Sequence, residues 1–101
     1  MDLLLPADFF LSQNFPNPFK EKTKIKYCLP VKSKVRLSIS DSVGYTAKVI
    51  VNQIQEAGTY ELEFNGSDLS NGEYSYVIIA SDLVSGTNKI FSETKKMILI
   101  E

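Results

Sequence analysis

The sequence predicts a single all-β domain, and three observations carry this prediction. Apolar and polar residues alternate along almost the whole chain, which is the period of half-buried strands and not of helices. Turn sequences such as Asn-Gly separate these runs at short intervals. The length of 101 residues suits one domain, and 44% hydrophobic with 23% charged residues is typical of a globular chain. Together they favour an immunoglobulin-like β-sandwich of about seven strands.

The first strand is expected over residues 23–29, where apolar and polar residues alternate. One face should pack inward and the other should meet water, with Cys28 on the water-facing side. A second strand over residues 35–40 follows Pro30 and ends at the turn Asp41–Gly44, where glycine permits positive φ. We predict that the two strands form a hairpin-like unit. The inward residues are Ile25, Tyr27, Leu29, Val35, Leu37 and Ile39.

Two further strands are expected over residues 45–51 and 60–64, with a polar connection between them at residues 55–58. Both keep the two-residue period of a half-buried strand. In the strand over residues 60–64, the carboxylates of Glu61 and Glu63 share the polar face. Paired carboxylates can perform acid and base catalysis, but alternating glutamates are far more often a solvated strand face, which we favour here.

The longest strand is expected over residues 74–82, after a turn region rich in Asn and Gly. Residues 77–80 are apolar on both faces, so we expect a central strand that is covered on both sides. A turn near Ser85-Gly86 leads to the last strand, which ends in residues 97–100. The earlier turn region could place side-chain oxygens around a calcium ion, but it contains only one carboxylate. We therefore favour a role in forming the turn over calcium binding for its polar residues. These residues are Asn65, Ser67, Asp68 and Asn71.

The composition argues against catalysis and against several classes of partner. Eleven basic and twelve acidic residues leave a net charge of −1, without the positive field that attracts nucleic acid. Histidine is absent and cysteine occurs once, so the usual triads, zinc sites and internal disulfides have no residues to form from. The apolar residues 3–7 are too few to span a membrane. We predict no catalytic, cofactor-binding or metal-binding residue, no nucleic-acid partner and no membrane span.

The segment from Leu11 to Phe19 is more distinctive than the strand pattern. Pro16 and Pro18 fix their own φ angles and push the residues before them into extended conformations. We therefore expect a rigid corner, with the aromatic side chains of Phe15 and Phe19 capping the open end of the sandwich core.

This segment and several later motifs resemble one known family. It is the type A C-terminal sorting domain of proteins exported by the type IX (Por) secretion system of Bacteroidetes-like bacteria. The family run Leu-x-Gln-Asn-Tyr-Pro-Asn-Pro-Phe is matched with phenylalanine in the tyrosine position, and the later matches keep the family's order and spacing. The matched residues are Leu11, Gln13, Asn14, Phe15, Pro16, Asn17, Pro18, Phe19, Thr23, Ile25, Tyr27, Leu29, Pro30, Val35, Leu37, Ile39, Asp41, Gly44, Ala57, Gly58, Asp68, Leu69, Gly72, Tyr74, Tyr76, Lys95, Lys96, Met97, Ile98 and Leu99.

The resemblance implies a non-catalytic sorting tag that directs an upstream passenger of the same polypeptide through the type IX system. The implied partners are the outer-membrane secretion machinery and its processing peptidase, and the implied route is the periplasm and then the cell surface or release. Most motif residues are expected to act structurally: Phe15, Pro16, Asn17, Pro18, Phe19, Asp41, Gly44, Gly72 and Tyr74. Recognition is expected in the closing strand, which would offer a sheet edge and a basic pair: Lys95, Lys96, Met97, Ile98, Leu99 and Ile100.

Two further expectations concern boundaries and an alternative function. Residues 1–8 are expected to be a linker or a remnant of an expressed fragment, and residues 9–101 the sorting-type domain. The chain departs from the family at Lys20–Lys22, where Asn-Pro is common, and at Glu101, where lysine is usual. The alternative is an immunoglobulin-like structural or carbohydrate-contacting accessory module of a larger extracytoplasmic or flagellar protein, similar to the domain of hook-capping proteins.

Overall fold

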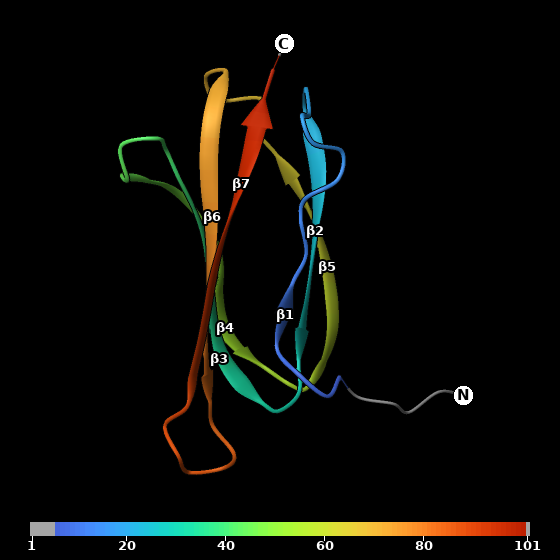
Figure 1. Cartoon of the computed structure of the whole chain (residues 1–101), viewed down its shortest axis with the longest axis vertical. Helices are drawn as coiled ribbons and strands as arrows, with labels where there is room; N and C mark the ends of the chain where they lie inside the picture. Colours follow the sequence, from blue (N-terminus) through green and yellow to red (C-terminus); the bar gives the residue numbers. More distant parts are fainter. Residues whose placement is uncertain (1–5, 101) are drawn as a thin grey trace, which may run out of the picture.

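The computed structural model describes residues 6–100, which form seven strands joined by turns (Figure 1). The predicted all-β class is confirmed. Of the expected linker, residues 1–5 lie outside the described residues, as does Glu101. The strands are β1 (Phe10–Leu11), β2 (Lys22–Leu29), β3 (Ser33–Ser40), β4 (Thr46–Gln55), β5 (Gly58–Asn65), β6 (Gly72–Asp82) and β7 (Ile90–Leu99).

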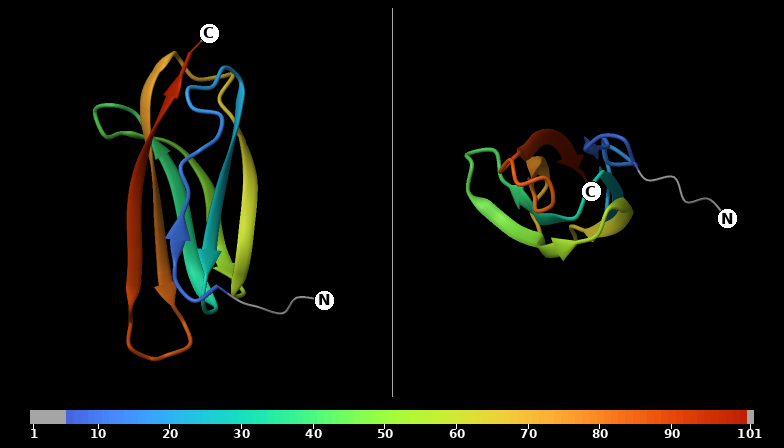
Figure 2. Two further views of the ribbon diagram at one scale, coloured as in Figure 1. Left: turned by 45° about the vertical axis from the view of Figure 1, so that its right-hand side comes forward. Right: turned by 90° about the horizontal axis from the view of Figure 1, so that it is seen from below.

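The strands build two antiparallel sheets that pack face to face (Figures 1 and 2). The smaller sheet has the order β1-β2-β5, and the larger has the order β4-β3-β6-β7. Alternate residues of each strand point to the space between the sheets, as the two-residue period predicts. This arrangement confirms the predicted immunoglobulin-like sandwich.

One core lies between the sheets and takes buried side chains from six of the strands and from the segment before β2, and the partly buried Ile50 and Val51 of β4 pack against it. The sequence period therefore placed the inward residues of β2 and β3 correctly, since all of them are buried. The buried apolar residues are Leu11, Phe19, Ile25, Tyr27, Leu29, Val35, Leu37, Ile39, Phe64, Tyr74, Tyr76, Ile78, Ala80, Met97 and Leu99.

The predicted hairpin of the first two long strands is wrong. β2 pairs with β1 and β5, whereas β3 pairs with β4 and β6, so the chain crosses from one sheet to the other between Leu29 and Ser33. In a hairpin the two apolar faces would lie side by side in one sheet. Here they face each other across the core, which buries both faces. The Ser33 hydroxyl donates to the Val31 carbonyl (2.8 Å) at the crossing.

β6 is confirmed as a central strand, because it lies between β3 and β7, and with 11 residues it is the longest. The expectation that both its faces are covered is wrong. On the outer face Ile79 is 37% exposed and Val77 is only partly buried. The described residues form two layers, so this face of the sheet meets solvent and its apolar side chains are covered only by their neighbours in the sheet.

Residues 52–55 continue β4 beyond the strand end expected at residue 51, and they include Gln55, the first residue of the connection predicted over residues 55–58. They pair with β3 from Ser33 to Arg36, so the turn to β5 shrinks to Glu56 and Ala57. The expected strand end at residue 51 was wrong, because an edge strand of a sandwich can carry polar residues on its solvent side without losing its backbone pairing.

Candidate functional site

The closing strand and the proline-rich segment before β2 lie side by side at one end of the sandwich (Figure 2). We call residues 12–19 the proline segment. The peptide bonds Phe15–Pro16 and Asn17–Pro18 are both cis. Phe19 forms a parallel bridge with Leu99, so this segment extends the larger sheet at the outer edge of β7.

Four hydrogen bonds attach the proline segment to β7 and to Ile100, the residue that follows it. They use backbone groups that point away from β6, and two of them have side-chain partners on the segment while the other two have the backbone of Phe19. The bonds are Gln13 Nε2 to Lys96 O (2.6 Å), Ile98 N to Asn17 Oδ1 (2.9 Å), Phe19 N to Ile98 O (2.9 Å) and Ile100 N to Phe19 O (2.9 Å).

These bonds change the expectation that the closing strand offers a free edge. β7 is an edge strand of its sheet, but its C-terminal half is already paired with the proline segment. Outward groups recur every second residue of an antiparallel strand, so Ser92 and Thr94 carry the next ones. Within residues 6–100 no backbone or side-chain bond reaches these outward groups. The open part of the edge is therefore the N-terminal half of β7.

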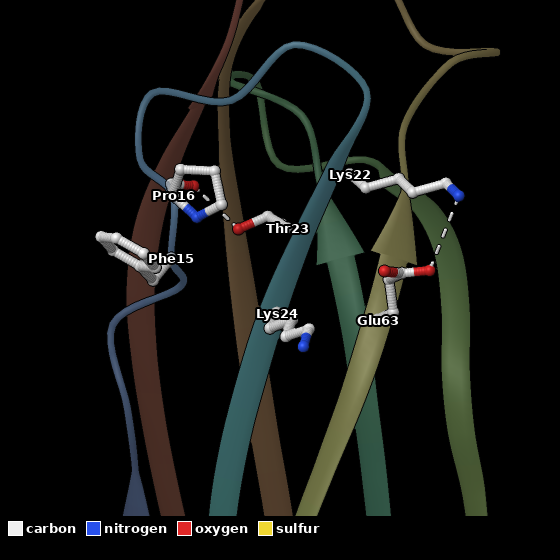
Figure 3. A pocket seen from close by; sticks show the side chains of 6 residues that line it. All are labelled: Phe15, Pro16, Lys22, Thr23, Lys24 and Glu63. Carbon is white, nitrogen blue, oxygen red and sulfur yellow. Dashed lines mark hydrogen bonds and ion pairs between the residues drawn. The ribbon is translucent and has the colours of Figure 1, made fainter.

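A buried polar cluster holds the proline segment against β2. Asn14 is 2% exposed, and its Nδ2 donates to the Pro16 carbonyl (3.2 Å) and to the Thr23 hydroxyl (3.0 Å). The Thr23 hydroxyl donates to the same carbonyl (2.8 Å), as Figure 3 shows. Gln13 Nε2 donates to Asn14 Oδ1 (2.7 Å). Buried amides need such partners, so the motif residues Asn14 and Thr23 fix the backbone of the segment.

The two aromatic residues of the segment have different environments. Phe19 is 1% exposed and packs edge-on against Phe64, with ring centroids 6.3 Å apart. Its predicted capping role is confirmed. Phe15 is 78% exposed, so the same prediction is wrong for Phe15. Successive residues of an extended segment point to opposite sides, and Asn14 occupies the inward position next to it.

The predicted recognition residues divide into an inward and an outward set. Met97 (0% exposed) and Leu99 (3%) belong to the core, so a partner cannot contact their side chains in the folded domain. Lys96, Ile98 and Ile100 are exposed on the other face, the last two at 40%.

The two lysines of the basic pair lie near different carboxylates and differ in exposure. Lys95 Nζ lies 3.2 Å from Glu93, a neighbour on its own strand, and is the less exposed of the two lysines. Lys96 Nζ lies 3.9 Å from Glu73 and its side chain is 72% exposed. Exposed pairs of this kind contribute little to stability, so Lys96 remains accessible to a partner.

The Asp41–Gly44 motif forms the β3–β4 turn. Asp41 Oδ1 accepts hydrogen bonds from the backbone of Val43 and Tyr45 (both 3.0 Å), and Gly44 takes φ of 95°, which favours glycine. Two other motif residues, Gly72 and Tyr74, lie at the start of β6. Gly72 has φ of 149°, and the hydroxyl of Tyr74, which is 8% exposed, donates to the Ser70 carbonyl (2.7 Å).

The carboxylates and turn oxygens that were weighed as catalytic or calcium sites form ordinary surface contacts within the fold. Glu63 lies 3.9 Å from Lys22 on the outer face of the smaller sheet, and Asn65 Oδ1 accepts from the backbone of Ser67 (2.9 Å). A hydrogen bond from Lys48 (2.8 Å) holds the pKa of Asp68 below its ordinary value. Over residues 6–100 no group of three or more His, Cys, Asp or Glu side chains is arranged to hold a metal. The same residues include no helix long and apolar enough to cross a membrane.

Tyr76 ties the proline segment to the centre of the larger sheet, and its removal gives a test of this link. Its hydroxyl is buried and donates to the Ser12 carbonyl (2.6 Å). We expect Tyr76→Phe to lower the free energy of unfolding by about 1–3 kcal/mol, because the carbonyl loses its partner. Urea unfolding at pH 7 measures this, and superimposable wild-type and variant curves would contradict it.

The same hydroxyl predicts a loss of stability in alkali. Burial raises the pKa of Tyr76 to about 12, against about 10 in the unfolded chain. Between these values the unfolded state releases the proton and the native state keeps it, so stability falls as pH rises. The expected fall is about 2 kcal/mol between pH 10 and 12. Tyr76→Phe should make this decline shallower. Part of the decline should remain in the variant, because burial also raises the pKa of Tyr27.

A family model described as "Secretion system C-terminal sorting domain" matches residues 13–99. The matched range begins in the proline segment and ends with β7, so it covers both partners of the edge contact. Neither the curated proteins nor the solved structures gave a significant match.

Proposed function

This chain belongs to the family of secretion system C-terminal sorting domains, and from that premise we propose that it is a folded, non-catalytic tag recognised at the closing strand. Domains of this family are the sorting signals of type IX secretion, so the chain directs a passenger to the cell surface or to release. The observation that carries this function is the family match over residues 13–99.

A non-catalytic role agrees with how the ionisable groups are used. The carboxylates that approach cations do so at the surface, in pairs such as Lys48–Asp68 and Lys95–Glu93. Such surface pairs are ordinary for a solvated protein face and do not provide two carboxylates in unlike environments. We propose that residues 9–101 are the tag and that the passenger lies upstream.

The partners follow from the sorting role. Interaction with the type IX machinery is implied by family membership. We propose that the tag passes through the periplasm, engages the outer-membrane machinery and is then removed by a processing peptidase. The upstream passenger would be joined at the end of the sandwich where the chain enters β1, opposite to the end of β7 (Figure 1). A passenger so placed lies away from the C-terminal half of the closing strand.

The recognition surface is proposed to be the outward face of the closing strand. Lys96, Ile98 and Ile100 line this face and combine one accessible cation with two partly exposed apolar side chains. Their backbone is fixed by the proline segment, so the three side chains have a defined arrangement before a partner binds. Met97 and Leu99 contribute indirectly by anchoring the strand in the core.

Export of a reporter tests this function. A reporter with a signal peptide and this chain at its C-terminus is expressed in a host with a working type IX system. The parent fusion should reach the cell surface, and the double substitution Lys96→Glu with Ile98→Ser should lower export about tenfold or more, since two contact residues are lost. The measurement is the surface fraction of the reporter after cell fractionation.

Lys89→Glu is the matched control, because Lys89 is an exposed cation in the loop before β7. Its fusion should be exported like the parent. Periplasmic retention of a folded parent fusion would contradict the sorting function and favour the accessory-module alternative. Normal export of the double variant would contradict recognition at the outward face of β7 and leave the sorting function standing.

A further inference from the structure

The side chain of Phe15 points into solvent and does not contribute to the core. It is 78% exposed, whereas the neighbouring motif residues Asn14 and Phe19 are 2% and 1% exposed. Its backbone is nonetheless held rigidly, because Phe15 and Lys24 exchange two hydrogen bonds (3.0 and 2.9 Å). A large aromatic side chain on a fixed backbone is the usual anchor of a protein interface, since little conformational freedom is lost on binding.

Two shallow grooves meet at Phe15 on the outer face of the smaller sheet (Figure 3 shows the first). The first has a volume of about 260 Å³ and the second about 350 Å³. Phe15 and Lys24 line both, so the grooves form one surface with Phe15 between them. Phe10, which is 50% exposed, also lines the second groove. The surface therefore presents two aromatic side chains with a lysine in reach of both grooves.

The charges of this surface are incompletely neutralised. Lys22 and Glu63, which line the first groove, form an ion pair at 3.9 Å. Lys24, Lys26 and Glu61 remain, and within residues 6–100 none of the three forms an ion pair. One positive charge is therefore in excess where the two grooves meet. An acidic group there gains a partner, and a basic group would meet two cations.

We propose that Phe15, Phe10 and Lys24 form a docking surface for a protein segment that carries an acidic side chain between two apolar ones. The apolar side chains pack on the two phenylalanine rings and the carboxylate pairs with Lys24. The surface lies on the smaller sheet and adjoins the closing strand at Gln13, which lines the second groove and donates to Lys96 O, but it uses other contact residues than the closing strand does. This proposal rests on the sorting function, in which the segment belongs to the export machinery.

The export reporter described above tests the surface with two substitutions. Phe15→Ala and Lys24→Glu should each lower surface export about tenfold, because each removes a central contact. Tyr45→Ala is the control for the first, since Tyr45 is also aromatic and is 75% exposed at the β3–β4 turn. Lys34→Glu, on the outer face of the larger sheet, is the control for the second. Both controls should be exported like the parent, and thermal unfolding should show all four variants folded.

A photocrosslinking residue at position 15 of the exported fusion identifies the occupant. The expected adduct is a peptide of a protein partner with Asp or Glu between apolar residues, and Lys24→Glu should abolish it. An adduct with a lipid or a glycan, a peptide without an acidic residue, or no adduct would overturn the assignment.

The outcomes separate this surface from the function on which it rests. Export of the parent with equal export of Phe15→Ala and Lys24→Glu overturns the docking surface alone. Retention of the parent overturns the sorting function and the surface with it.

Discussion

Deleting residues 95–101 should unfold the domain and not merely remove a signal. The deletion removes Met97 and Leu99 from the core and takes away the partners of Phe19 and Asn17. Loss of each buried side chain costs about 2–5 kcal/mol, so the sum approaches the entire stability of about 5–15 kcal/mol that a domain of this size has. Circular dichroism and proton NMR of the purified truncated chain measure the outcome.

The double variant Lys96→Glu with Ile98→Ser is the control for the truncation. It changes exposed side chains only, so it should retain the dispersed NMR spectrum of the folded chain. A truncated chain with a cooperative unfolding transition and native chemical shifts would contradict the role assigned to the end of β7. Loss of export on truncation is therefore expected from unfolding alone, and only surface substitutions report on recognition.

Replacing Phe19 with alanine should lower the free energy of unfolding by about 3–5 kcal/mol, the usual cost of emptying a buried aromatic site. The ring packs on Phe64, and the space beside it is closed by Gly66, where an added Cβ would lie 3.3 Å from the ring. The melting temperature should fall by at least about 12 °C, since each kcal/mol is worth about 4–8 °C in a domain of this length.

Phe15→Ala is the matched variant, because it removes the same side chain four residues away in the same segment. Its ring is 78% exposed, so we expect a change within about 0.5 kcal/mol. Calorimetry of both variants measures the contrast. Equal destabilisation by the two substitutions would contradict the different environments of the two rings.

The period of the sequence predicted the strands and their inward faces well, because burial on one face is a local property of alternating residues. The inward sets of β2 and β3 and the turn at Asp41–Gly44 are all where the pattern placed them. The pattern does not say which sheet a strand joins. An apolar face can meet another across the core as well as beside it, and this is why the hairpin of β2 and β3 was wrongly predicted.

The candidate site was predicted less completely than the fold. Residues of the proline segment and the closing strand were singled out, but their mutual pairing was not, since contacts between Asn17 and Ile98 join positions far apart in the chain. The short strand β1, two residues long, gives too few positions to show a period. The exposure of Phe15 depends on its neighbour: the carboxamide of Asn14 takes the inward place, and composition alone would assign that place to the aromatic ring.

The pairing of the proline segment with β7 has a consequence for biosynthesis. The groups that Gln13, Asn17 and Phe19 bind belong to residues 96–100, so this part of the tag closes only after those residues have left the ribosome. Contacts of such long sequence separation form slowly, because closing the intervening stretch of chain costs conformational entropy. A polypeptide that stops before residue 96, through early termination or proteolysis, lacks the groups that close the tag. Export that requires a closed tag therefore selects chains whose synthesis has reached this end.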